Sequence, residues 1–167
     1  PFYSFIMCWN DVGDDTRMHP QSPVETGENL LAGVYNTLRN SAHWEDTLLI
    51  VNFDENGGIY DHVQPPVTIP PYPGSPPDVW VSGSGQQYEF DYTILGFRIP
   101  VLLISTWLNT GIDNTQFQNT AILRFLQDLA SSSTGQGPAS FLTQRDRYAN
   151  SVALAFEEFG AENMRTD

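Results

Sequence analysis

The sequence contains no lysine, a single cysteine and no long apolar run. Its seven basic residues are all arginines, and they face 20 acidic residues, so the formal net charge is −13. A protein that follows a nucleic-acid backbone needs a basic face, and the composition therefore excludes that class for this chain by itself. No apolar run approaches the roughly 20 residues of a membrane-spanning helix. We interpret the acidity as a contribution to solubility.

The lone cysteine, Cys8, has no partner for a disulfide within the chain. It is either a small buried side chain, as unpaired cysteines usually are, or the partner of a cysteine elsewhere. Residues 1–6 start without methionine and have the composition of a strand-forming piece, which favours a fragment or a product of a longer precursor. With 167 residues, of which 40% are apolar, the chain is long enough for one core.

The most informative segment is an apolar run, residues 48–53, that ends in two carboxylates. Its Leu, Ile and Val content predicts a strand buried on both faces, as in a parallel sheet. Asp54 and Glu55 follow at the strand end where ligands of open α/β sheets bind. Adjacent carboxylates repel each other unless a cation holds them, and their oxygens suit Ca²⁺, Mg²⁺ or Mn²⁺. The alternative is a solvated turn, made sharp by Gly57 and Gly58.

Two histidines stand near residues that carry chemistry. Pro20 disfavours helix at His19, so this imidazole is presented from an extended or turn backbone. It is either a surface side chain or a phosphate contact and general acid. His62 follows Asp61 directly, and this pair either orients the metal-binding loop or forms only a hydrogen-bonded turn.

The coarse organisation predicts alternating helices and strands. Apolar spacing predicts a helix over 25–40, and the strand 47–53 completes a helix-then-strand unit typical of α/β sheets. The other predicted segments are a Pro-rich irregular excursion (63–84), a second buried strand (98–105), a helix (115–130), a flexible linker (131–138) and a short helix (149–159) within a C-terminal segment (139–167).

Several short segments, in order and with their spacing preserved, resemble one family of proteins. Upstream they are His19-Pro20, Gly27-Glu28, residues 34–41, residues 44–48 and residues 53–66, and downstream they are residues 96–100, 104–107 and 142–146. Together they are similar to the phosphoesterase family that contains phosphatidylcholine-type phospholipases C and related secreted acid phosphatases. The resemblance covers nearly all of the chain. It implies an alkaline-phosphatase-like α/β/α sandwich with a mostly parallel central sheet, to which residues 1–130 contribute a C-terminal portion.

The resemblance also implies roles for individual residues. Asp54 and Glu55 match the carboxylate ligands of one divalent metal ion, and His19 matches an active-site histidine that contacts the phosphoryl group. The family's Ser or Thr nucleophile, and a Glu-Asn pair that also binds metal, lie upstream of the matched region. We therefore expect them on a missing N-terminal portion or a second chain. Where the family commonly has Asp-His-Thr-Ser, this sequence has residues 118–121, with Asn119 in place of the histidine.

The function that the resemblance implies is metal-dependent hydrolysis of phosphoric esters by an acid phosphatase-like enzyme. One alternative is a phospholipase C acting on phosphatidylcholine-type diesters. A third, of another class, is a non-catalytic remnant or binding module of the same fold. Family analogy also implies a secreted, extracellular or periplasmic location.

Overall fold

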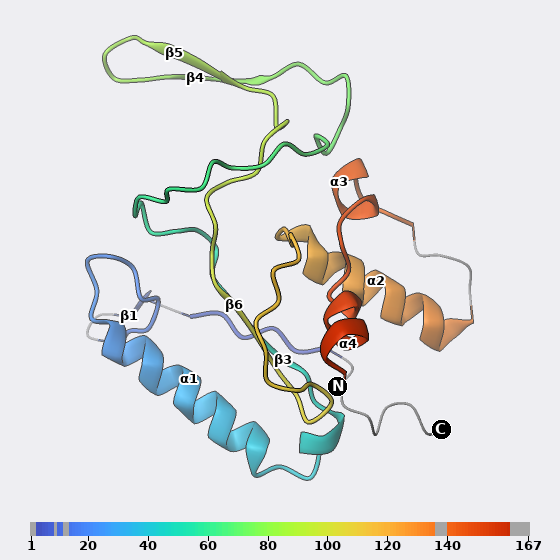
Figure 1. Ribbon diagram of the computed structural model, residues 1–167. Helices are drawn as coiled ribbons and strands as arrows, with labels where there is room; N and C mark the ends of the chain where they lie inside the picture. Colours follow the sequence, from blue (N-terminus) through green and yellow to red (C-terminus); the bar gives the residue numbers. More distant parts are fainter. Residues whose placement is uncertain (1–2, 9, 12–13, 136–139, 161–167) are drawn as a thin grey trace. The chain divides into compact units, whose positions relative to one another are not determined.

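The computed structural model describes residues 3–8, 10–11, 14–135 and 140–160, and it has mixed α/β content (Figure 1). In chain order its elements are β1 (Asn10–Asp11), β2 (Asp14–Asp15), α1 (Val24–Arg39), a 3₁₀ helix η1 (Trp44–Asp46), β3 (Leu49–Asn52), β4 (Asp78–Val81), β5 (Gln87–Phe90), β6 (Val101–Ile104), α2 (Thr120–Thr134), α3 (Gln144–Arg147) and α4 (Ala153–Phe159). Within the described ranges, no helix has the length and apolar character to cross a membrane.

The chain divides into two compact units. The first contains the described residues up to Val51, together with Gly57–Ile59 and Val101–Thr106. The second contains Asn52–Asn56, Tyr60–Pro100 and the described residues from Trp107 onward.

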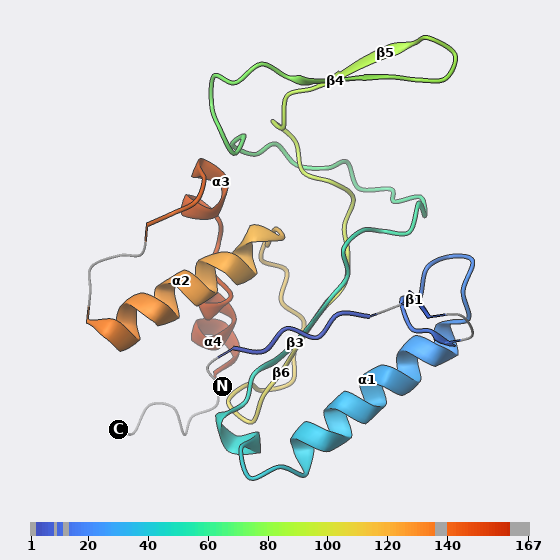
Figure 2. The same ribbon diagram turned by 180° about the vertical axis from the view of Figure 1, so that it is seen from behind.

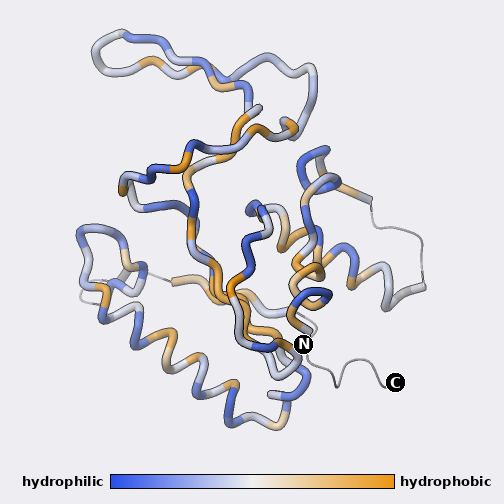
Figure 3. The backbone as a smooth tube through the Cα atoms, in the orientation of Figure 1, coloured by the Kyte–Doolittle hydropathy of each residue, from blue (hydrophilic) through white to orange (hydrophobic). Residues whose placement is uncertain are grey.

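Helix α1 and the aromatic cluster at its end organise the first unit. The helix occupies the predicted position, and apolar and polar residues alternate along it (Figure 3). Trp44, in η1, is 7% exposed and is a buried aromatic side chain of this unit. The Tyr35 ring meets it edge-on at 5.7 Å, and the Arg39 guanidinium lies 5.4 Å from its ring centroid. These contacts fasten the end of α1 to the segment that leads into β3.

Strands β3 and β6 form a two-stranded sheet and lie side by side from both directions (Figures 1 and 2). Two expectations, a strand buried on both faces at 48–53 and a second buried strand at 98–105, are wrong for the described residues, since the residues of β3 have intermediate or high exposure. Val101 and Leu102 of β6 are 43% and 51% exposed. Apolar β-branched runs have the propensity to pair as strands, but burial of each face requires a further packed layer. Cys8, before β1, is a free thiol of intermediate exposure.

The Pro-rich region is more regular than its composition predicts. We call residues 63–97 the arm. Strands β4 and β5 pair antiparallel within it, with Trp80 opposite Tyr88. Outside the two strands, the Thr68 amide donates to the Thr93 carbonyl at 2.8 Å, and the Leu95 amide donates to the Pro66 carbonyl at 2.9 Å. The prediction of an irregular excursion over 63–84 is therefore wrong for β4, because the prolines lie outside this strand.

The helices of the second unit differ from the predicted ones mainly at their ends. Helix α2 begins five residues later than the predicted 115–130 helix and continues through residues 131–134, where a linker was expected. Residues 136–138 of that linker lie outside the described residues. The predicted helix 149–159 is shorter, since α4 begins at Ala153, and α3 was not predicted. Phe125 of α2 stacks on Phe156 of α4, with ring centroids 6.4 Å apart.

A buried carboxylate organises the start of α3. Asp146 is 0% exposed and accepts hydrogen bonds from the amides of Leu142 and Thr143 and from Gln127 Nε2, at 2.6–2.9 Å. Thr143 and Asp146 also cap each other reciprocally. Burial raises the pKa of Asp146, but these hydrogen bonds outweigh burial and lower the pKa to about 2.

Arg145, which precedes Asp146 in the sequence, anchors the arm to α3. Arg145 Nε donates to the Ile69 carbonyl at 2.9 Å, and its Nη2 donates to the Tyr92 carbonyl. The amide of Gln144 donates to the Pro71 carbonyl at 2.9 Å. One guanidinium thus joins both sides of the arm to α3, and burial lowers its pKa.

Candidate active site

The two adjacent carboxylates lie in an exposed turn immediately after β3. The Glu55 amide donates to Asp54 Oδ1 at 3.0 Å, which orients the Asp54 side chain along the backbone. In the part of the chain that the structure describes, neither carboxylate forms an ion pair with a basic side chain. Their oxygens are therefore available to an external cation.

The glycine pair that follows has the left-handed backbone expected from the sequence. Gly57 and Gly58 have φ angles of +67° and +70°, a conformation that glycine adopts without steric cost. Gly57 also approaches the loop that carries His19, because a Cβ built on Gly57 would lie 3.1 Å from Cγ of Pro20. The structure therefore brings the His-Pro and Gly-Gly segments into contact within the first unit.

His19 lies on an exposed turn that its neighbours hold in place. The Ser22 amide donates to the His19 carbonyl at 2.7 Å. Next to it, Arg17 forms a two-bonded ion pair with Asp15 at 2.8 and 2.9 Å, and the Ser22 hydroxyl donates to the same carboxylate at 2.5 Å. The hydrogen bond from Arg17 holds the pKa of Asp15 well below its usual range. Sequence reasoning missed this pair, although the Asp15 and Arg17 spacing suits such a turn.

Asp61 forms a two-bonded ion pair with a partner, Arg98, that sequence reasoning missed. Arg98 Nε and Nη2 donate to its two carboxylate oxygens, each at 2.8 Å, and the Val63 amide donates to Oδ1 at 3.0 Å. The hydrogen bond from Arg98 holds the pKa of Asp61 far below its usual range. The pair closes the base of the arm, because Asp61 precedes the arm and Arg98 follows it.

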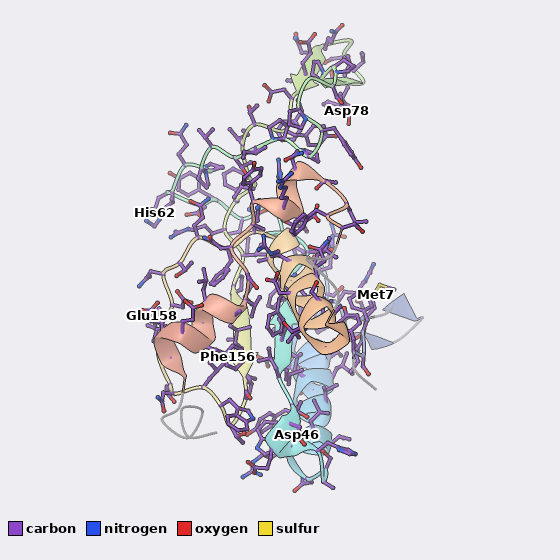
Figure 4. The ribbon with its side chains drawn as sticks, turned by 90° about the vertical axis from the view of Figure 1, so that its right-hand side faces the viewer. Met7, Asp46, His62, Asp78, Phe156 and Glu158 are labelled. Carbon is purple, nitrogen blue, oxygen red and sulfur yellow. The ribbon has the colours of Figure 1, made fainter. Side chains whose placement is uncertain are left out.

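His62 makes only a loose contact with this ion pair. Its Nδ1 lies 3.8 Å from Asp61 Oδ1, its side chain is 81% exposed, and it projects outward from the backbone in Figure 4. Asp61 therefore has an orienting contact with Arg98, whereas His62 has only a loose contact with Asp61. The role of the pair in orienting a metal-binding loop stays a prediction.

The predicted site residues fall in both units. His19 belongs to the first unit, whereas Asp54, Glu55, Asp61 and His62 belong to the second. Among residues 3–8, 10–11, 14–135 and 140–160, no three His, Cys, Asp or Glu side chains gather into a group able to hold a metal ion. Ca²⁺ and Mg²⁺ take six or more oxygen ligands, so Asp54 and Glu55 suit such an ion chemically but supply only part of its coordination.

Substitution of Asp61 tests whether its ion pair with Arg98 fastens the arm. Asp61→Asn removes the charge that Arg98 grips, and we expect chymotrypsin to cleave within residues 63–97 about three- to fivefold faster. His62→Gln is the matched control, since His62 contributes no short contact to the pair and its replacement leaves cleavage unchanged. Equal cleavage rates for Asp61→Asn and the native protein would show that Arg98 does not fasten the arm.

Comparison with known proteins decides the family. Residues 1–131 match the Phosphoesterase family. The chain belongs to this family.

Curated relatives support the assignment. The chain is 34% identical to non-specific phospholipase C3 of Arabidopsis thaliana over 143 residues, which is 80% of this chain and 25% of that protein. It is 40% identical to phospholipase C B of Mycobacterium tuberculosis (strain ATCC 25618 / H37Rv) over 116 residues, 65% of this chain and 22% of that protein. The chain thus spans about a quarter of the length of these relatives. The predicted membership of the phosphoesterase family is confirmed.

Proposed function

We propose that the protein is a hydrolase of phosphoric esters of the phospholipase C type. The observation that carries this proposal is the match to the Phosphoesterase family, together with relatives from a plant and a bacterium that are both named phospholipase C. The acid phosphatase function was the leading expectation from sequence, but the relatives favour the phospholipase C alternative. We therefore place phosphatidylcholine-type diesters ahead of phosphomonoesters as substrates.

One divalent cation of the Ca²⁺, Mg²⁺ or Mn²⁺ type is part of the proposal. Asp54 and Glu55 would supply two carboxylate ligands, and the hydrogen bond from the Glu55 amide orients the Asp54 side chain. Such a cation, when bound, would offset negative charge on the reacting phosphoryl oxygens. Further oxygen ligands would have to come from residues outside this pair.

The chain's own residues would then bind and orient the ester. His19, presented from a turn that Asp15 and Arg17 brace, would donate a proton to a phosphoryl oxygen or to the leaving oxygen. Arg98 would fix Asp61 and with it the end of the segment that carries the carboxylates. The nucleophile, by family resemblance, would be a Ser or Thr outside these 167 residues, so that hydrolysis would pass through a covalent phosphoenzyme.

The proposal also covers the layers of the fold and the cellular location of the protein. The partly exposed strands β3 and β6 would be covered by further layers of an α/β/α sandwich, because exposed Val101 and Leu102 favour burial. The location we propose, by family analogy, is secreted, extracellular or periplasmic.

One observation favours a second candidate, a non-catalytic module of the same fold. Asn119 stands where the family commonly has a histidine, and it occupies the N-cap position that precedes α2, without a capping hydrogen bond from its side chain. An amide cannot titrate as an imidazole does, so any proton transfer at that position would be lost. The two candidates differ in whether the full-length protein turns over any phosphoric ester.

A comparison of two soluble substrates tests the proposal. The full-length protein, supplied with Mg²⁺, Mn²⁺ or Ca²⁺, is assayed on p-nitrophenyl phosphorylcholine and on p-nitrophenyl phosphate. We expect kcat/KM to be at least about tenfold higher for the phosphorylcholine diester. A preference for the monoester would restore the acid phosphatase assignment, and no turnover of either ester across the pH range would favour the non-catalytic module.

A further inference from the structure

The hairpin β4–β5 carries a row of exposed aromatic side chains that the proposed chemistry does not use. Trp80 and Tyr88 lie opposite each other on one face, and their ring centroids are 5.3 Å apart. Phe90 shares that face and meets Tyr92 at 4.7 Å. Trp80 is 63% exposed, although tryptophan is usually well covered in a folded protein.

The second face of the hairpin is apolar along β4 and polar along β5, where Glu89 and Gln87 stand opposite Val79 and Val81. Val79 and Val81 alternate with Trp80 along β4, so they lie on the opposite face, and both are more than half exposed. Within the described chain the hairpin is a sheet of only two strands, drawn in green in Figure 1. An exposed apolar surface of this kind marks a site of contact with a partner.

The hairpin is held in a fixed shape. At its tip, the Ser82 amide donates to the Gln86 carbonyl at 2.8 Å, and the Gln86 amide donates back to the Ser82 hydroxyl at 3.0 Å. At its base, the Tyr92 hydroxyl donates to Asp78, which Figure 4 labels. Arg145 fastens the Tyr92 carbonyl to α3. Its aromatic side chains are therefore preorganised, which lowers the entropic cost of binding.

The outer part of the hairpin, between Asp78 of β4 and Glu89 of β5, is uncharged. No charged residue occurs from Val79 to Tyr88, whereas the whole chain carries a net charge of −13. Anionic membrane surfaces repel such a chain. An uncharged outer part bearing Trp and Tyr suits the boundary between headgroups and acyl chains, where amphipathic aromatic rings concentrate.

We propose that the hairpin β4–β5 docks the protein on the surface of zwitterionic phospholipid, with Trp80 and Tyr88 inserted at the headgroup level. The choice of phospholipid rests on the proposed function, whereas the exposed aromatic pair and the uncharged stretch from Val79 to Tyr88 do not. Docking would hold the protein at a lipid surface without a transmembrane segment, as interfacial elements do.

Vesicle binding tests this proposal without reference to catalysis. The full-length protein is sedimented with vesicles of phosphatidylcholine alone and with vesicles that also contain phosphatidylglycerol. We expect binding to phosphatidylcholine, weaker binding to the anionic vesicles, and about a tenfold loss of binding for the Trp80→Ser, Tyr88→Ser double variant. Tyr72→Ser is the matched control, because Tyr72 is in the same arm and is also 63% exposed.

A second variant controls for a change in the shape of the hairpin caused by the double substitution. Val81→Asp leaves the Trp80–Tyr88 ring pair intact but introduces a charge at the tip, and we expect a similar loss of binding. Absence of binding by the native protein, or equal binding by all variants, would overturn the proposal. So would concentration-dependent dimers of the native protein that the double variant abolishes, since the hairpin would then bind a second copy.

Hydrolysis of p-nitrophenyl phosphorylcholine separates the two proposals. If the double variant hydrolyses this soluble ester normally but loses vesicle binding, both proposals stand. If the native protein binds vesicles but hydrolyses neither soluble ester, the proposed function fails and the docking surface stands. If it hydrolyses the ester but its vesicle binding is unaffected by the double substitution, only the docking proposal fails.

Discussion

Asp54→Asn is expected to lower kcat/KM on a phosphoric diester by about 100-fold or more and to lower bound divalent cation in parallel. The amide keeps the shape of the side chain and one oxygen, but it removes the negative charge that a hard cation requires. The measurement pairs steady-state kinetics with metal analysis of the same full-length protein. Glu55→Gln is expected to act in the same direction.

Glu158→Gln serves as the control for this substitution. Glu158 is an exposed carboxylate near the end of α4, remote in sequence from the candidate site, so the same chemical change there leaves kinetics and metal content unchanged. A protein in which Asp54→Asn loses activity but keeps its metal would refute the assignment of Asp54 as a ligand. Unchanged activity with unchanged metal would remove Asp54 from the site altogether.

Asp146→Ala is expected to cost about 3 kcal/mol of unfolding free energy. The carboxylate is fully buried, and its removal leaves the Leu142 and Thr143 amides and the Gln127 side chain without their acceptor. Urea denaturation of the full-length protein measures the loss. Asp128→Ala is the matched control, because Asp128 pairs with Arg124 at the protein surface and such pairs contribute less than about 1 kcal/mol.

The pH dependence of stability follows from the same carboxylate. The pKa of Asp146 in the folded protein is about 2, below the usual value of 3.8 for an aspartate. Its ionised form therefore stabilises the fold fully above about pH 4, and this contribution, about 2 kcal/mol, is lost as the pH falls from 4 towards 2. We expect Asp146→Asn to lack this acid-sensitive component. An identical acid profile for the native protein and the variant would contradict the account.

Local features of the chain were predictable from sequence where neighbouring residues decide them. Helix α1 follows its apolar periodicity, and the left-handed backbone at Gly57 and Gly58 follows from the glycine pair. Strand β3 was predictable from its run of Leu, Ile and Val residues. The strand pattern could not show how much of each face would be covered, because burial depends on layers that a single strand does not contain.

Long-range contacts escaped prediction because no local pattern encodes them. Arg98 meets Asp61 across 37 residues of sequence, and the contact forms only once the arm folds back on itself. The hairpin β4–β5 was missed because the prolines before it suggested irregular structure, although Val79 and Trp80 have clear strand propensity. For the candidate site, sequence indicated which residue types could bind a cation, and the roles of His19, Asp54 and Glu55 stay predictions.

The most direct test of the central claim is the identity of the products formed from phosphatidylcholine by the full-length protein, before and after removal of divalent cations. The account predicts diacylglycerol and phosphorylcholine in equal amounts, loss of both on chelation, and recovery when Ca²⁺, Mg²⁺ or Mn²⁺ is restored. Phosphatidic acid and choline as products, or hydrolysis that chelation leaves intact, would contradict it.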